Sequence, residues 1–143
     1  MKVLSLRQPW ACLVVHFGKS IENRRWNSHF RGEFLIHAAK GMTRREFDEA
    51  LAFARSVLGD ACPTEERLRS ILRFGGIVGH ARLVDVVPPC AGVGGRCQCS
   101  AALSFGRSWH WPEQYGFVLE DVVPLPFRPC RGHLGFFELK EAA

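Results

Sequence analysis

Residues 4–26 read LSLRQPWACLVVHFGKSIENRRW, and this stretch contains the pattern of three successive elements. Leu4 and Leu6 flank Ser5 with the alternation of a short strand. Proline at a helix start loses no hydrogen bond, so Pro9 marks the beginning of a helix. Apolar residues follow at helical spacing, namely Trp10, Leu13, Val14 and Phe17. Gly18 then ends the helix. Alternation resumes over 20–26, so the stretch predicts strand, helix and strand.

Cap and turn signals divide the rest of the chain. Thr43 and Glu46 form a capping box, which predicts a helix that extends to Gly59. Pro63 is expected to open a further short helix. Alternating or continuous apolar runs predict the remaining strands over 33–38, 75–87, 115–123 and 135–139.

Two segments lie between these strands. Residues 88–112 are rich in glycine and cysteine and are expected to form a long loop, which is uncommon in a compact domain unless the loop is functional. Pro124, Pro126 and Pro129 predict a rigid extended link. The order of elements favours an α+β fold, a barrel of about five to six mostly antiparallel strands with two to three flanking helices.

Composition limits the class of protein. The chain has 143 residues, so residues 1–143 are expected to form a single domain. No apolar run approaches the ~20 residues of a membrane span, and the first residues resemble a strand more than a signal peptide. We therefore expect a cytoplasmic protein with no membrane partner. The net charge of +5 and the pI of about 9.1 favour phosphate-bearing partners.

The most informative polar cluster spans 19–26. Strand periodicity places Glu22, Arg24 and Trp26 on one face, with Lys19 at the entrance of the strand. Arginine can clamp phosphate, and an exposed tryptophan can stack on an unpaired base. The alternative interpretation is a solvated strand face with an ordinary ion pair.

Two further clusters combine bases and aromatics. Lys40 follows His37 and precedes a predicted helix start, where anions are favoured, although a surface lysine and a satisfied histidine would explain the pattern equally well. Residues 104–111 interleave aromatic and basic side chains, and Ser108 and Trp109 are candidates for contacts with single-stranded nucleic acid. Here the alternative is an aromatic anchor that packs the loop onto the barrel.

Cysteine spacing gives a weak metal signal. Cys90, Cys97 and Cys99 cluster, and Cys130, His80 or His110 would be needed to complete four ligands. The spacing is not the paired pattern of strong zinc motifs, so reduced thiols are favoured over structural zinc. No cofactor is expected.

The motifs of the chain as a whole resemble the ASCH domain family. The matching segments are 4–11, the pattern Lys19-x-x-Glu22-x-Arg24, 31–32, 36–38, 75–79, 115–120 and 132–138. The resemblance implies a PUA-like barrel with a cleft beside the first helix that carries Lys19, Glu22 and Arg24. It also implies binding of RNA, other single-stranded nucleic acid or a modified nucleoside.

Under this resemblance we expect a basic cleft for nucleic acid, formed by Arg7, Trp10, Lys19, Glu22, Arg24, Trp26, Lys40, Ser108 and Trp109. The alternative is a hydrolase that acts on a modified nucleobase or on RNA, with Lys19 and Glu22 as acid and base groups. A related branch that hydrolyses acetylated cytidine has a threonine where this chain has Glu22, which argues against the same mechanism. A protein-interaction domain anchored by Trp109 and Trp111 is a third reading.

Overall fold

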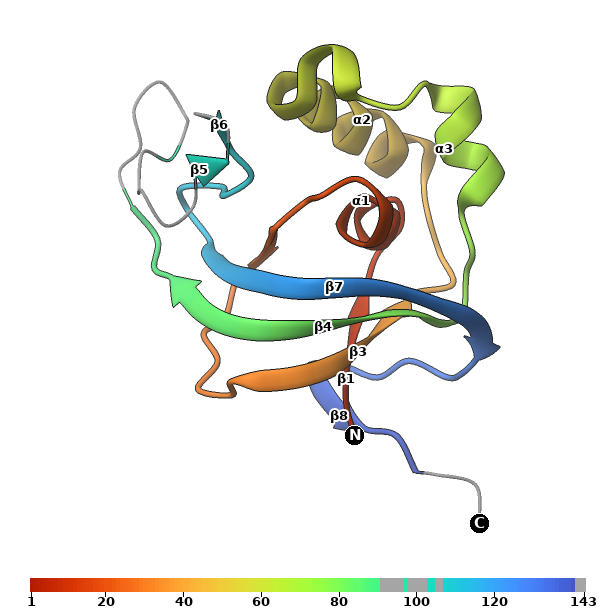
Figure 1. Cartoon of the computed structure of the whole chain (residues 1–143), viewed down its shortest axis with the longest axis vertical. Coiled ribbons are helices and arrows are strands. Elements are labelled where there is room, and N and C mark those ends of the chain that lie inside the picture. Colours follow the sequence, from red (N-terminus) through yellow and green to blue (C-terminus); the bar gives the residue numbers. More distant parts are fainter. Residues whose placement is uncertain (91–96, 98–102, 105–106, 141–143) are drawn as a thin grey trace.

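The computed structural model describes residues 1–90, 97 and 107–140 together with 103–104, with backbone alone for 103–104 and 107–108. A six-stranded mixed sheet curls around the first helix, and two more helices cover that helix from the other side (Figure 1). The helices are α1 (Trp10–His16), α2 (Arg44–Leu58) and α3 (Glu65–Ile71), with a single 3-10 turn η1 (Gly59–Ala61) between the last two. The predicted α+β barrel-like class is confirmed.

The sheet has the strand order β2-β7-β4-β3-β1-β8. Its strands are β1 (Lys2–Leu6), β2 (Ile21–Arg24), β3 (Gly32–Ala38), β4 (Gly76–Val87), β7 (Tyr115–Pro129) and β8 (Phe136–Glu138). β1 pairs with β3 in parallel, and the other pairings are antiparallel. Two further strands, β5 (Leu103–Ser104) and β6 (Arg107–Ser108), form a small separate sheet within the predicted 88–112 loop.

The prolines of 124–129 do not form a link. They continue β7, which pairs with β4 as far as Gly76 opposite Pro129. Proline is tolerated where one edge of a strand needs no donor. Among the described pairings, β2 covers the other edge of β7 only over 115–118, so the proline-rich half of β7 needs no donor on that side. The predicted link is therefore wrong.

Helix α1 is central because both of its faces are buried. Ala11, Val14 and Val15 pack into the sheet cluster, whereas Cys12 and Leu13 pack against the α2 cluster. The sheet approaches α1 so closely that a Cβ on Gly79 would lie 2.8 Å from Val15 Cγ2. This packing fixes the position of both ends of α1.

Local signals explain the helix boundaries. The predicted capping box is present at α2, with Thr43 Oγ1 accepting from the Glu46 amide and the Glu46 carboxylate accepting from the Thr43 amide. The side chain of buried Gln8 accepts from the Cys12 amide and donates to the Arg73 carbonyl, tying α1 to the segment after α3. In the described residues, no helix is long and apolar enough to cross a membrane.

Candidate nucleic-acid interface

A turn after α1 delivers Lys19 into the interior. Gly18 adopts a left-handed φ of 72°, and the Lys19 amide donates to the Leu13 carbonyl at 3.1 Å. The side chain of Lys19 is 1% exposed, and its Nζ donates to the Ile21 carbonyl. The sequence-predicted lysine is therefore a buried group and not part of a solvated strand face.

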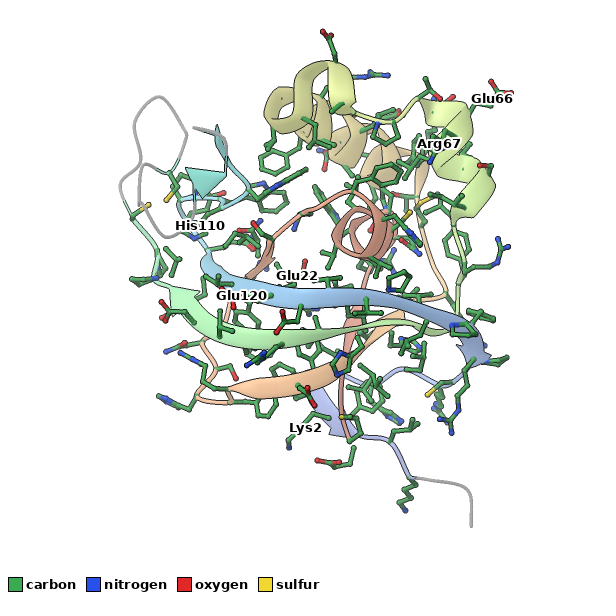
Figure 2. The ribbon with its side chains drawn as sticks, in the orientation of Figure 1. Lys2, Glu22, Glu66, Arg67, His110 and Glu120 are labelled. Carbon is green, nitrogen blue, oxygen red and sulfur yellow. The ribbon has the colours of Figure 1, made fainter. Side chains whose placement is uncertain are left out.

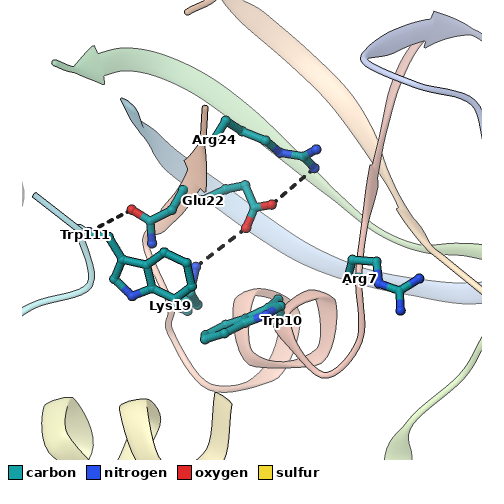
Figure 3. Close-up of a pocket in the computed structure, with 7 residues that line it drawn as sticks. Arg7, Trp10, Lys19, Glu22, Arg24 and Trp111 are labelled. Atoms are coloured by element: carbon teal, nitrogen blue, oxygen red, sulfur yellow. Dashed lines mark hydrogen bonds and ion pairs between the residues drawn. The ribbon is translucent and has the colours of Figure 1, made fainter. Parts of the chain in front are cut away.

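Lys19, Glu22 and Arg24 form one ion-paired triad. Glu22 Oε1 lies 3.6 Å from Lys19 Nζ, and Glu22 Oε2 lies 3.2 Å from an Arg24 terminal nitrogen, as Figure 3 shows. The Arg24 guanidinium also donates to the Ser5 carbonyl at 2.6 Å. Burial lowers the pKa of Lys19, the Glu22 carboxylate opposes this shift, and the Arg24 charge adds to it. Figure 2 shows the carboxylate of the triad, Glu22, lying between the sheet and α1.

The triad lines a cavity of about 190 Å³, which we call the tryptophan cavity. Its lining residues are Arg7, Trp10, Lys19, Glu22, Asn23, Arg24 and Trp111. Lys19 Nζ lies 5.2 Å from the Trp10 ring centroid, and the Trp10 and Trp111 rings meet edge to face at 5.5 Å. The cavity thus combines a charged floor with two aromatic walls (Figure 3).

Asn23 binds the backbone of Trp111, the second aromatic wall, which lies 88 positions away in the sequence. Its Oδ1 accepts from the Trp111 amide at 2.9 Å, and its Nδ2 donates to the Trp109 carbonyl at 3.0 Å. Asn23 was not predicted as a site residue, and Trp111 was predicted only as an anchor for a protein partner and not as a nucleic-acid contact. The Trp-His-Trp run of 109–111 was the one sequence signal that pointed to Trp111.

A second cavity of about 550 Å³ adjoins the first, because Arg7 and Arg24 line both. We call it the basic cavity. Its charged and histidine lining residues are Arg7, Arg24, His37, Lys40, Arg131 and His133, and none of the described residues that line it is acidic. Lys40 and Arg131 make no ion pair with any described residue. The pair of cavities therefore forms a continuous positive surface beside α1.

His37 is held within the fold. Its Nδ1 lies 2.8 Å from Ser5 Oγ, and its Nε2 lies 2.7 Å from the Cys130 carbonyl oxygen. The Nε2–H therefore donates to the carbonyl, and Nδ1 accepts from the hydroxyl. Both ring nitrogens of His37 are therefore hydrogen-bonded within the fold, as in the structural alternative that the sequence allowed for this residue.

The remaining predicted residues lie apart from the tryptophan cavity. Trp26 does not line that cavity, but it lines a shallow pocket that shares Asn23 and Arg24 with it, and its ring centroid lies 5.9 Å from Arg24 Cζ. Its ring also packs edge to face on Phe117 and Phe136, with ring centroids 5.2 and 6.1 Å away. The side chain of Trp109 is 1% exposed and packs with residues of α2, which agrees with the alternative in which this tryptophan anchors its loop. Ser108 lies in β6, where the structure describes the backbone alone. Of the predicted nucleic-acid residues, the structure thus gathers Arg7, Trp10, Lys19, Glu22, Arg24 and Lys40 around the two adjoining cavities.

The predicted metal candidates are partly described. Cys90 and Cys97 lie with His110 in a cluster whose ligand atoms are within 4.8 Å of one another, and Cys99 lies outside the described residues. In the part of the chain that the structure describes, no other group of three such side chains lies close enough to share an ion.

Arg7 is oriented at the junction of the cavities by Glu46. Two hydrogen bonds join them, Nε to Oε2 at 2.8 Å and a terminal nitrogen to Oε1 at 2.5 Å. These bonds from Arg7 are the largest cause that lowers the pKa of Glu46 to about 2, and the Thr43 amide adds to the shift.

We expect the Glu46→Gln variant to lose the pH-dependent stabilisation that the Arg7–Glu46 ion pair contributes. The capping box should remain, because glutamine can replace glutamate in it. Because the folded-state pKa of Glu46 lies below the ordinary value of 4.5, the carboxylate stabilises the folded state above pH 4.5 and loses this effect as the pH falls toward about 2. The pair is partly exposed, so the difference should be about 0.5–1 kcal/mol at neutral pH. Urea unfolding of both proteins at several pH values measures it. A stability difference that stays constant across that pH range would contradict a lowered pKa for Glu46. Glu49→Gln, which removes a carboxylate from an exposed pair, is the control.

Comparison with known proteins identifies a family. A family model described as the ASCH domain matches residues 4–126 of the chain, which include both aromatic walls and the triad. A search of curated proteins found no significant match.

Proposed function

Because the chain belongs to the ASCH domain family, we propose that it binds single-stranded RNA and holds one base in the tryptophan cavity. The match confirms the resemblance that the sequence motifs carry. The proposal rests on the ion-paired triad of Lys19, Glu22 and Arg24, which lines the same cavity as Trp10 and Trp111. Such a site offers stacking and edge recognition together.

The size of the cavity favours a single base. Its volume of about 190 Å³ is below the roughly 300–1,000 Å³ of pockets that take drug-sized ligands. A carboxylate oxygen has more than one acceptor site, so Glu22 can keep both ion pairs and still accept from an exocyclic amine. The Nε of Arg24 is buried and has no hydrogen-bond partner among the described residues, so it is a donor for an incoming acceptor.

The basic cavity would take the phosphates on either side of the bound base. Lys40 and Arg131 are exposed, and they and Arg7 lie along the same surface. Phosphate contacts of this kind supply affinity and little sequence selectivity. Selectivity would come from the tryptophan cavity, where a base edge meets Glu22, Asn23 and Arg24.

Salt dependence tests the role of the basic cavity. We expect the Lys40→Ala/Arg131→Ala variant to bind a short single-stranded RNA more weakly at ~50 mM salt. Its salt slope should also be smaller, by about 0.7 for each phosphate that the variant no longer neutralises. Fluorescence anisotropy at several salt concentrations measures both quantities. Arg45→Ala, which removes an exposed charge that lines neither cavity, is the matched control. Equal slopes for the three proteins would rule out the proposed phosphate path.

A second candidate function has one specific observation in its favour. Burial lowers the pKa of Lys19, which leaves more of its amine unprotonated at neutral pH than in an ordinary lysine, and Glu22 lies beside it. Hydrolysis of a modified base, such as acetylated cytidine, would use this pair as base and acid. Incubation with that nucleoside and chromatography of the products decides the matter. Turnover that disappears in Glu22→Gln would favour an enzyme, and intact nucleoside would leave binding as the function.

A further inference from the structure

Three metal-ligating side chains converge on the far side of the tryptophan wall. The ligand atoms of Cys90, Cys97 and His110 lie within 4.8 Å of one another, although the residues are up to twenty positions apart in the sequence. Cys97 is 1% exposed, His110 is 2% exposed, and Cys90 is partly buried. Figure 2 labels His110, which lies beside the start of β7 and close to β5 and β6. Two thiols and an imidazole in a shielded position are the donor types that zinc selects.

The orientation of His110 suits a metal ligand. Its Nε2 lies 2.5 Å from the Gln114 carbonyl oxygen, so Nε2 carries the proton and donates it to that oxygen. This tautomer leaves the lone pair on Nδ1. Histidine ligands in metal sites usually donate their other ring N–H to a carbonyl or carboxylate, which fixes the ring and the tautomer.

The ring is also held by close packing. A Cβ on Gly116 would lie 2.6 Å from His110 Cδ2, so a side chain at this position of β7 would displace the imidazole. The Cys90 amide donates to the Pro112 carbonyl at 2.7 Å, which ties the segment after β4 to the segment before β7. Two of the three donor residues, His110 and Cys90, are therefore held in place by contacts with the chain around them.

We propose that Cys90, Cys97 and His110 bind a zinc ion. With Zn–S distances of about 2.3 Å and Zn–N of about 2.0 Å, tetrahedral donors lie roughly 3.5–3.8 Å apart, so the cluster needs to contract by only about 1 Å. Each thiol gives up its proton to bind as a thiolate, and His110 binds through the neutral Nδ1. A tetrahedral ion has one further position, which a water molecule or another side chain can fill.

The site would hold the wall of the tryptophan cavity. Trp109 and Trp111 flank His110, and Asn23 bonds the backbone of both tryptophans. A metal at His110 therefore joins the loop after β4 to the segment that carries Trp111. This inference stands independently of what the cavity binds, because its readouts are metal content and stability.

Cobalt(II) and zinc(II) are the probes for the test. Reduced full-length protein should take up about one cobalt ion per chain and show visible bands of tetrahedral cobalt with thiolate charge transfer, and zinc should displace the cobalt. Zinc in excess should raise the Tm by about 5–10 °C over chelator-treated protein. Cys62→Ser, which removes a thiol outside the cluster, should behave like the unmodified chain.

Two variants make the test decisive. Cys90→Ser changes a partly buried residue and should fold, yet it should lose the charge-transfer bands and bind zinc at least ~10-fold more weakly. His110→Gln should lose the zinc-dependent Tm shift. The proposal is overturned if cobalt gives no thiolate bands, if Cys90→Ser binds like the unmodified chain, or if mass spectrometry of freshly purified protein shows a Cys90–Cys97 disulfide in place of the metal.

Discussion

The Glu22→Gln variant is expected to be about 3 kcal/mol less stable than the unmodified chain, the largest loss expected from any single change in the triad. Glu22 lies within 4 Å of both Lys19 and Arg24, and within the described part of the chain it is the one acidic side chain that pairs with either. Removing one partner of a buried pair leaves an uncompensated charge, which costs far more than the pair contributes. Urea unfolding monitored by circular dichroism measures the loss.

Two controls separate this effect from the removal of an ordinary surface pair. Glu49→Gln removes a carboxylate from the exposed pair with Arg45 and should change the unfolding free energy by less than about 0.5 kcal/mol. Glu22→Gln leaves both Lys19 and Arg24 without their carboxylate, and Lys19→Met/Glu22→Gln removes the more deeply buried of these two charges, so it should recover at least about 1 kcal/mol of the loss. If Glu22→Gln were no worse than Glu49→Gln, the buried triad would not exist as described.

The same variant should respond to pH in a defined direction. The pKa of Lys19 is already lowered by burial, and loss of the carboxylate removes the influence that raises it. Between the lowered pKa of folded Lys19 and the ordinary value of 10.5, the unfolded chain holds a proton that folded Lys19 has released, so in this range the stability of Glu22→Gln should rise with pH relative to that of the double variant. A flat difference between the two proteins would contradict a buried Lys19 whose pKa is lowered.

The Trp111→Leu variant is expected to bind single-stranded RNA about 10- to 100-fold more weakly, since stacking on an aromatic side chain contributes roughly 1–3 kcal/mol per base. Trp111 forms one wall of the tryptophan cavity, and leucine keeps apolar volume there while removing the ring. Trp111→Phe should restore most of the affinity. Anisotropy titrations under the salt conditions used for the Lys40 and Arg131 variants allow direct comparison.

Trp26 supplies the matched control for this prediction. Sequence reasoning also placed it at the site, it is 37% exposed, and it contacts Arg24 from outside the tryptophan cavity without lining that cavity. Trp26→Leu should therefore leave the affinity within about two-fold, a change below ~0.5 kcal/mol. If Trp26→Leu weakened binding and Trp111→Leu did not, the base would stack on the outer face of the barrel and the tryptophan cavity would have another role.

Both cavities explain why the chain combines a basic composition with buried charge. The basic cavity presents exposed cations, whereas the tryptophan cavity holds the buried and paired Lys19 and Glu22. Electrostatic interactions are stronger where water is excluded, so under the proposed function the triad would distinguish base edges that exposed side chains would not. Arg7 and Arg24 connect the two environments.

Features whose partners lie close together along the chain could be predicted from the sequence alone. The capping box of α2 needs only Thr43 and Glu46, and the triad of Lys19, Glu22 and Arg24 follows from one turn and one strand. Helical and strand periodicities are local properties, which is why the order of elements and the barrel class could be predicted.

The partners of the aromatic and sulfur-containing residues depended on the tertiary structure. Trp111 lines the cavity with its amide bonded to Asn23 across 88 positions, whereas Trp26 packs on Phe117 and Phe136 and does not line the cavity. The pairing of β4 with β7 brings Cys90, which follows β4, close to His110, which precedes β7, and Cys97 joins them from a distant position in the sequence. The prolines of β7 are tolerated because β2 is short. An apolar or aromatic side chain has no directional code for its partner, so packing of the whole chain selects that partner.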